Sequence, residues 1–353
     1  MPGRGPSSPI VVRGRVFVTA SAGPRQDRLM VLCFDAASGR QLWRREFWAT
    51  GRTLTHPMSS VAAPTPASDG TRIFAFYSSN DLVCLDLEGN LCWYRGLAYD
   101  YPKAGNDAGM ASSPAVADET VVVQVENQGD SFAIGIDTGC GETRWRIPRD
   151  PVGNWSSPIV LPEERPGGGR TILLQAPSGL TAVDARTGEK LWQCPLACAA
   201  IPSSAAWNGR ICVPAGGLTA IGWSAASGAP AVVWECKRIS PNASSPVVDG
   251  GRVYAINGAG VLGCAEADSG KLLWQVRLGG KHWSTPVICG KRMYCISEDG
   301  KARVVDLSAR GQLMGTSDFG ETVLCSPAAA EGALYVRSDR YLWKIAHRAT
   351  TAP

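Results

Sequence analysis

A short motif recurs along the chain roughly every 40 residues, and it limits the possible folds more than any other feature of the sequence. In most copies it is a Ser or Thr followed by Pro. The eight copies are Ser8-Pro9, Thr65-Pro66, Ser113-Pro114, Ser157-Pro158, Ser203-Ser204-Ala205, Ser245-Pro246, Thr285-Pro286 and Ser326-Pro327. A fixed period of this length indicates an architecture made by stacking one supersecondary unit.

Each copy of the motif is followed by strand-like segments separated by turn residues. The sixth unit is the clearest, with strand segments at 246–248, 252–256, 261–266 and 271–278. The turns between them are Asp249-Gly250, Asn257-Gly258 and Asp268-Ser269-Gly270. Four short strands joined by tight turns predict one blade of a β-propeller.

A tryptophan closes most units at a fixed distance from an aspartate and a glycine. The fourth unit reads Asp184-Ala-Arg-Thr-Gly188-Glu-Lys-Leu-Trp192. The repeat-placed indoles are Trp43, Trp93, Trp145, Trp192, Trp234 and Trp274. The seventh unit keeps Asp306 but has Leu313 or Met314 where the Trp is expected. Because a lone four-stranded sheet cannot bury both faces, we interpret these indoles as structural docking residues that fill the gaps between adjacent sheets.

These units predict an all-β fold, namely an eight-bladed β-propeller of four-stranded antiparallel blades. We expect one domain over residues 1–353, with units starting near 8, 65, 113, 157, 204, 245, 285 and 326. The last unit supplies only three strand segments, at 327–330, 333–337 and 341–345, so this blade is predicted to lack its outer strand.

The pattern Ser-Ser-Pro-x-Val followed by Asp-x-x-Thr-Gly-x-x-x-Trp resembles the pyrroloquinoline-quinone (PQQ) repeat of quinoprotein alcohol dehydrogenase-like propellers. The resemblance covers Ser8 to Ile345. That repeat also builds bacterial propellers without a cofactor, including the outer-membrane assembly lipoprotein type. Such rings usually close with an outer strand from the N-terminus. Met1 aligns with Leu278, after most of an outer strand, so we expect a truncated start, the alternative being a naturally three-stranded blade.

The resemblance implies a periplasmic or exported location if the start is truncated. Met1–Pro9 contains no signal peptide, and the sequence alone leaves the compartment unknown. The many cysteines fit poorly with an oxidising compartment.

Twelve cysteines raise the question of a metal or disulfide site, but their repeat positions argue against one. Cys33, Cys84 and Cys264 occupy one position in different units and cannot converge, so they read as small buried residues. Cys194 and Cys198 form the closest pair, either a weak ligand pair or two unrelated loop thiols. The vicinal cysteines common in PQQ dehydrogenases and the Cys-x-x-Cys-His haem motif are both missing from the sequence.

Loop insertions mark the expected binding face. In a propeller, the loops from an outer strand to the next inner strand share one face with the loops between the second and third strands. The candidate ligand-binding residues in these loops are His56, Asp100, Tyr101, Lys103, Asn106, Asp107, Glu126, Asn127 and Asp130. The oxygen-rich side chains suit Ca²⁺, or they are ordinary solvated loop residues that hydrogen-bond one another.

Trp155 and Trp283 precede two of the Ser/Thr-Pro motifs and are therefore expected near the central axis. An indole at that place either stacks on a planar ligand or plugs the channel. His282 adjoins Trp283 and completes the candidate binding set. No catalytic triad or zinc spacing is visible, and no catalytic or metal-ligating residue is assigned.

Two functions remain open at this point. The first is a non-catalytic scaffold that binds a protein or peptide partner on the loops of blades 2–4 and carries no cofactor. The alternative is a quinoprotein oxidoreductase that uses PQQ with calcium. A net charge of +4 without a basic cluster argues against nucleic acid, and no apolar run of membrane-spanning length is present. We expect a monomer.

Overall fold

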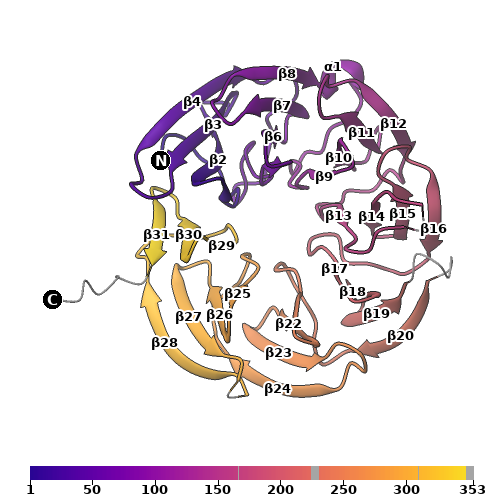
Figure 1. Cartoon of the computed structure of the whole chain (residues 1–353), viewed down its shortest axis with the longest axis vertical. Helices are drawn as coiled ribbons and strands as arrows, with labels where there is room; N and C mark the ends of the chain where they lie inside the picture. Colours follow the sequence, from indigo (N-terminus) through magenta and orange to yellow (C-terminus); the bar gives the residue numbers. More distant parts are fainter. Residues whose placement is uncertain (166, 224–229, 309, 347–353) are drawn as a thin grey trace.

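The computed structural model describes residues 1–165, 167–223, 230–308 and 310–346. They form a ring of eight antiparallel sheets that follow one another around a central axis in sequence order (Figure 1). Among the described residues the single helix is α1 (Leu97–Asp100). The predicted all-β, eight-bladed propeller is therefore confirmed.

The strands of each blade follow one another in the sheet in chain order. Blades 1 and 2 contain β1 (Ile10–Val12), β2 (Arg15–Ala22), β3 (Arg28–Asp35), β4 (Gln41–Trp48), β5 (Ala67–Ser68), β6 (Arg72–Phe76), β7 (Asp81–Asp86) and β8 (Leu91–Gly96). Blades 3 and 4 contain β9 (Ala115–Ala117), β10 (Thr120–Val125), β11 (Phe132–Asp137), β12 (Thr143–Pro148), β13 (Ile159–Val160), β14 (Thr171–Ala176), β15 (Gly179–Asp184) and β16 (Lys190–Cys194). Blades 5 and 6 contain β17 (Ala205–Trp207), β18 (Arg210–Pro214), β19 (Leu218–Gly222), β20 (Ala231–Cys236), β21 (Val247–Asp249), β22 (Arg252–Ile256), β23 (Val261–Glu266) and β24 (Leu272–Arg277). Blades 7 and 8 contain β25 (Val287–Cys289), β26 (Arg292–Ile296), β27 (Lys301–Asp306), β28 (Gln312–Asp318), β29 (Ala328–Ala330), β30 (Ala333–Arg337) and β31 (Leu342–Ala346).

The last blade is the exception, because its sheet has three strands, β29, β30 and β31. This confirms the three strand segments expected from the last repeat. In Figure 1 this yellow blade lies beside the indigo first blade, so the last and first blades share one boundary. Tyr335 of β30 donates its hydroxyl to the Ala36 carbonyl in blade 1 at 3.4 Å, which joins the two blades.

The recurring Ser or Thr side chains form a closed ring of hydrogen bonds around the axis. The backbone N–H at each of these positions donates to the hydroxyl of the equivalent residue in the next blade, at 2.9 to 3.0 Å. The ring closes where the Ser326 N–H donates to Ser8 Oγ at 3.0 Å. In blade 5 the hydroxyl belongs to Ser203, one residue before the expected unit start.

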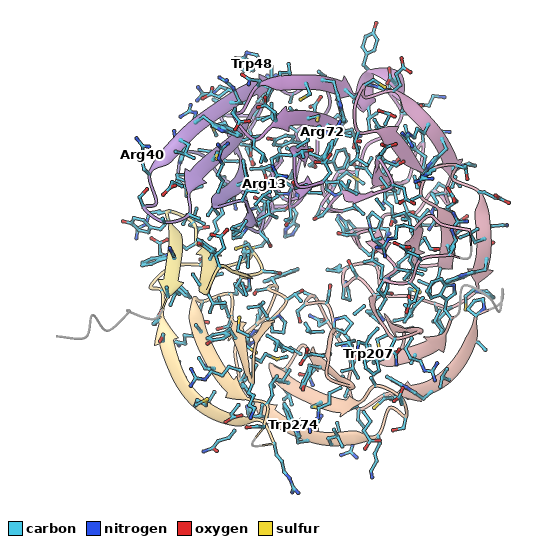
Figure 2. The ribbon with its side chains drawn as sticks, in the orientation of Figure 1. Arg13, Arg40, Trp48, Arg72, Trp207 and Trp274 are labelled. Carbon is cyan, nitrogen blue, oxygen red and sulfur yellow. The ribbon has the colours of Figure 1, made fainter. Side chains whose placement is uncertain are left out.

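The repeated tryptophans lie between neighbouring blades. Trp145 Nε1 donates to the Ala185 carbonyl of blade 4 at 2.9 Å, and its ring covers Gly188, where an added Cβ would lie 2.6 Å from the indole. Gly188 has φ of +70° and forms part of the turn before β16. The same arrangement recurs in other blades: Trp274, labelled near the rim in Figure 2, covers Gly311, where an added Cβ would lie 2.5 Å from the indole. The turn glycine therefore serves both the backbone geometry and the approach of the indole.

Small residues lie across the strand pair from each indole. Cys33, Cys84 and Cys264 pair with Trp43, Trp93 and Trp274. Gly135, Ala182 and Ala220 take the same place opposite Trp145, Trp192 and Trp234. A Cβ added to Gly135 would lie 2.2 Å from the indole of Trp145. Three of the twelve cysteines therefore occupy a site that admits only small side chains.

Blade 7 departs from this pattern and corrects the expected register. Val304 pairs with Gly315 at the place where the other blades pair a small residue with Trp. Leu313 and Met314 precede that position, and both side chains are exposed. The expected Trp position was counted from Asp306 and fell too early. The segment from Asp306 to Gly315, the residue at the Trp position, is longer than the equivalent segment from Asp184 to Trp192. In this blade the larger side chain of the pair, that of Val304, lies on β27, and the glycine lies on the outer strand β28.

The cysteines form no disulfide, and all twelve are free. Burial raises the pKa of Cys33 and of Cys212 to about 12, which keeps both thiols protonated. Cys198 Sγ donates to the Leu196 carbonyl at 3.1 Å. These environments are those of packed or loop-capping thiols.

We predict that Trp145→Ala lowers the free energy of unfolding by about 3–5 kcal/mol, because it empties a blade interface. Trp48→Ala is the matched control, since Trp48 is 68% exposed at the end of β4 and should change stability by about 0.5 kcal/mol or less. Urea denaturation of both variants provides the comparison. Equal losses would contradict a structural role for the repeat indole.

Candidate functional site

One face of the ring carries the connections from each outer strand to the next inner strand, and the longest of them, 49–66 and 97–114, leave blades 1 and 2. In an up-and-down antiparallel blade, the outer-to-inner connection and the second-to-third strand connection lie at the same end of the sheet. We define the loop face as segments 49–66, 97–114, 149–158 and 195–204 together with residues 126–131. These are the loops in which the sequence placed most of the candidate residues.

Glu126 is the centre of a buried polar network on this face. Its carboxylate accepts from Arg149 Nε at 2.6 Å, from Asn154 Nδ2 at 2.8 Å and from Gln124 Nε2 at 3.1 Å. The side chain is buried, and burial raises the pKa of Glu126 while the Arg149 guanidinium opposes that rise. The network ties the 126–131 loop to the connection between blades 3 and 4.

Gln175 carries the network into blades 4 and 5. Its Nε2 donates to the carbonyls of Ala199 and Pro202 at 2.7 and 2.8 Å, and its Oε1 accepts from Ser204 Oγ at 2.7 Å. Its backbone carbonyl accepts from Asn154 Nδ2 at 2.7 Å. A continuous set of hydrogen bonds therefore fixes the loops of three blades relative to one another.

The other candidate carboxylates pair with arginines. Asp100 accepts from Arg95 Nη2 at 2.6 Å. Asp107 contacts Arg52 at 2.8 Å on the exposed surface. Asp130 accepts from Arg146. Each acidic side chain of the predicted cluster thus has its own cation.

This arrangement does not fit a calcium site. Calcium takes roughly six to eight oxygen ligands, whereas the carboxylates of this face are held apart by their arginines. Across the ranges that the structure describes, no group of three His, Cys, Asp or Glu side chains could hold a metal ion. The donor set therefore gives no support to a PQQ centre that depends on calcium.

Three further candidates, Tyr101, Asn106 and Asn127, make contacts that stabilise the loops in which they lie. The Tyr101 ring packs on Phe132 with 4.6 Å between centroids, and the Arg146 guanidinium lies 4.7 Å from the Tyr101 centroid. Asn127 Oδ1 accepts from the Gly129 N–H at 2.7 Å and closes its own loop. Asn106 is buried and accepts from the Ala108 N–H at 2.9 Å.

His56 and Lys103 are exposed members of the candidate set, as are Asp100 and Asp107. His56 Nδ1 accepts from the Met58 N–H at 3.2 Å. The Lys103 carbonyl accepts from the Asp130 N–H at 3.2 Å, so its backbone belongs to the loop structure.

Trp155, Trp283 and His282 belong to different local structures. Trp155 Nε1 donates to the Gly109 carbonyl at 2.8 Å, on the blade 2–4 side of the ring. Trp283 Nε1 donates to Glu298 at 2.9 Å, beside blade 7. Both ring nitrogens of the buried His282 lie about 3 Å from carbonyl oxygens, those of Ile296 and Gly279. The structure brings none of these three side chains to the Glu126 network.

The loop face also carries exposed apolar side chains that the sequence reasoning missed. Tyr99 of α1 is 87% exposed. The full set on the loop face is Leu54, Met58, Tyr99, Val152 and Ile201, and the exposed Trp48 (Figure 2) ends β4 directly before the first long connection. The sequence does contain a signal for these side chains, since they are apolar residues in segments that lack the alternating pattern of a strand.

We predict opposite pH trends for two glutamate variants. The raised pKa of Glu126 means that the folded protein binds this proton more tightly than the unfolded chain does, so wild-type stability falls as the carboxyl ionises. Glu126→Gln should therefore gain stability relative to wild type between about pH 4 and pH 7. The Ser338 hydroxyl lowers the pKa of Glu321, so Glu321→Gln should lose relative stability over the same interval. Denaturation at several pH values measures both trends, and parallel trends would contradict the Glu126 network.

Comparison with known families gives one matching family, in three overlapping segments. The model of a family described as outer membrane protein assembly factor BamB matches residues 28–206, 176–260 and 219–314. The outer membrane protein assembly factor BamB of Burkholderia pseudomallei (strain K96243) is 24% identical over 280 residues, covering 77% of this chain and 56% of the relative. The chain thus matches a little over half of that relative's length.

Solved structures share the fold at low identity. BamB from Moraxella catarrhalis superposes with a TM-score of 0.69 at 16% identity, covering 98% of this chain and 96% of that one. The quinohemoprotein alcohol dehydrogenase from Comamonas testosteroni gives 0.66 at 14% identity, covering 95% and 70%. An assembly factor and an enzyme thus share this ring, which by itself does not decide function. Within the described ranges, no helix is both long and apolar enough to cross a membrane.

Proposed function

The chain belongs to the family of the outer membrane protein assembly factor BamB, and on that premise we propose that it is a non-catalytic scaffold that binds a protein segment on the loops of blades 2–4. The single observation that carries the proposal is the set of exposed apolar side chains on the loop face. Large apolar side chains that are exposed on one face of a protein often belong to an interaction site.

The distribution of exposed apolar side chains favours this face. Of the large ones, Leu54, Tyr99, Val152 and Ile201 lie in the outer-to-inner connections of blades 1–5. Most others lie on outer strands, spread around the rim of the ring. The loop connections between blades 5 and 8 contribute Trp283. The asymmetry supports binding over blades 2–4.

The polar network beneath these side chains supports a binding role. Glu126 and Gln175 hold the loops of blades 3, 4 and 5 in one arrangement. A surface that is rigid before binding loses less conformational entropy when a partner docks. In addition, each carboxylate of this face that could act as a general acid or base is paired with an arginine.

The partner is proposed to be a protein of the outer-membrane assembly process, as the name of the matching family indicates. The exposed aromatic and aliphatic groups suit a segment with apolar side chains. On this proposal the protein works in the periplasm, as a monomer, and carries no cofactor.

We predict that Tyr99→Ser combined with Val152→Ser weakens partner binding by about tenfold or more, because each loses a buried apolar contact on docking. Leu273→Ser on β24 is the matched control, since it removes an exposed apolar group from the rim. A photo-crosslinking amino acid placed at position 99, and separately at 273, tests the same point in a bacterial host.

Adducts with outer-membrane assembly proteins should form from position 99 and be weak from position 273. Equal crosslinking from both positions, with unchanged binding by the double variant, would contradict the proposed face. Saturable quenching of tryptophan fluorescence by PQQ with Ca²⁺ would instead support the oxidoreductase alternative.

A further inference from the structure

The last blade presents an unpaired strand edge at the rim of the ring. β31 is the third strand from the axis, whereas the blades on either side of it continue to a fourth strand, β28 in blade 7 and β4 in blade 1 (Figure 1). In the part of the chain that the structure describes, no strand pairs with the outer edge of β31. Because neighbouring residues of an antiparallel strand point their N–H and C=O groups to opposite sides, every second residue of β31 presents backbone groups that have no strand partner.

The groove beside this edge has an uncovered docking place for an indole. Its volume is about 320 Å³, whereas one water-sized particle needs only roughly 10–15 Å³. Residues 35–39 of blade 1 and residues 340–344 of blade 8 form most of its lining. Among the described residues, nothing lies within 4 Å of a Cβ added to the turn glycine Gly39. The turn glycines at the same place in other blades each lie beneath a tryptophan of the preceding blade, namely Gly89, Gly141, Gly188, Gly270 and Gly311.

Two further groups of an indole site are present in this groove. In other blades the Trp Nε1 donates to the carbonyl of the residue after the turn Asp or Glu, at 2.9 to 3.0 Å. The equivalent carbonyl here belongs to Ala36, which follows Asp35 and accepts the Tyr335 hydroxyl at 3.4 Å. A carbonyl oxygen has two lone pairs and can accept a second donor. Tyr335 has the strand position of Tyr254, whose ring lies 5.9 Å from that of Trp274 between centroids.

The nearby parts of the chain are engaged elsewhere. Met1 reaches the groove, but the N-terminal segment pairs with β2, where Arg4 and Ser21 exchange backbone hydrogen bonds at 2.8 and 2.7 Å. The Trp343 ring, on β31 itself, lies 5.5 Å from the ring of Phe319 between centroids. A second ring presents outer strands flanked by those of neighbouring blades, so it does not fit a place one strand wide between β28 and β4. These observations favour a single extended segment from outside the ring.

We propose that this groove binds an extended segment of a partner protein, which adds to β31 as a fourth strand and inserts a tryptophan side chain over Gly39. Main-chain hydrogen bonds to β31 supply affinity, and the indole place selects the segment. The tryptophan lies opposite Lys344, which has the position of Cys264 in blade 6. Lys344 is exposed, and its ammonium group can lie on the face of the added ring. This rim site is separate from the loop face and does not rest on the function proposed above.

A synthetic peptide with the sequence of residues 271–278 tests the proposal, because the ring already uses that segment as an outer strand that carries a tryptophan. We expect saturable binding of the fluorescein-labelled peptide to the wild-type protein, measured by fluorescence anisotropy. Trp274→Ala in the peptide should weaken binding by about tenfold or more, since the indole place then stays unfilled. No saturable binding, or equal binding of the two peptides, would overturn the proposal.

Two glycine variants of the protein separate the groove from the rest of the surface. Gly39 has φ of +73°, a conformation that Asn tolerates, so Gly39→Asn adds a side chain at the indole place without changing the turn. It should weaken peptide binding by about tenfold. Gly14→Asn is the matched control, because Gly14 has φ of +72° in the β1–β2 turn of the same blade, outside the groove lining. Equal effects of the two substitutions would contradict a site over Gly39.

Hydrogen exchange locates the added strand without any substitution. The peptide should slow exchange at alternate amides of β31 and leave the amides of β28 unchanged. Protection that spares β31 would overturn the proposal. Sedimentation of the protein without peptide should show one ring per particle, whereas a dimer that Gly39→Asn dissociates would assign the groove to a second copy and overturn the proposal as well.

Discussion

The hydrogen bonds from the backbone N–H of each repeated Ser or Thr to the hydroxyl of the next one set the geometry on which the rest of the ring depends. Each bond fixes the start of one inner strand against the start of the next, at 2.9 to 3.0 Å. Because every hydroxyl accepts from its neighbour's backbone, the eight bonds have to close on themselves. The last of them, from Ser326 to Ser8, joins the last blade to the first. The Pro that follows most of these residues limits the backbone at the same point.

The outer part of each blade interface solves a second problem, that of filling the wedge that widens from the axis to the rim. The indole of Trp145 fills it between blades 3 and 4, and the small residue Gly135 makes room for the ring. Blade 7 shows that the pair is adjusted together, because Gly315 replaces the indole where Val304 replaces the small residue. Hydroxyls near the axis and indoles at the rim therefore act at the two ends of one interface.

The repeat allowed the fold to be predicted almost completely, since each blade solves the same packing problem with the same residues at the same spacing. The prediction failed at the blade 7 register, where the spacing from Asp306 was unequal and Gly315 gave no aromatic signal. The loop face has no period, so its location could be predicted but its contacts could not. Glu126 and Arg149 are 23 residues apart in the sequence, and they meet when β10, β11 and β12 pair in the sheet of blade 3. The sequence therefore left the acidic residues open to two interpretations, calcium ligands or ordinary hydrogen-bonded loop residues, and the structure gives each of them an arginine partner.

The most direct test of this account is hydrogen exchange at the Ser326 amide, the donor that closes the ring. If the hydroxyl ring holds blade 8 to blade 1, this amide is protected to the same degree as the equivalent amides of Ser113 and Ser157. Ser8→Ala then removes protection at Ser326 and leaves the other two unchanged, whereas Ser8→Thr retains it. An amide at Ser326 that exchanges freely in the wild-type protein, or is unaffected by Ser8→Ala, would contradict the claim that these bonds close the propeller.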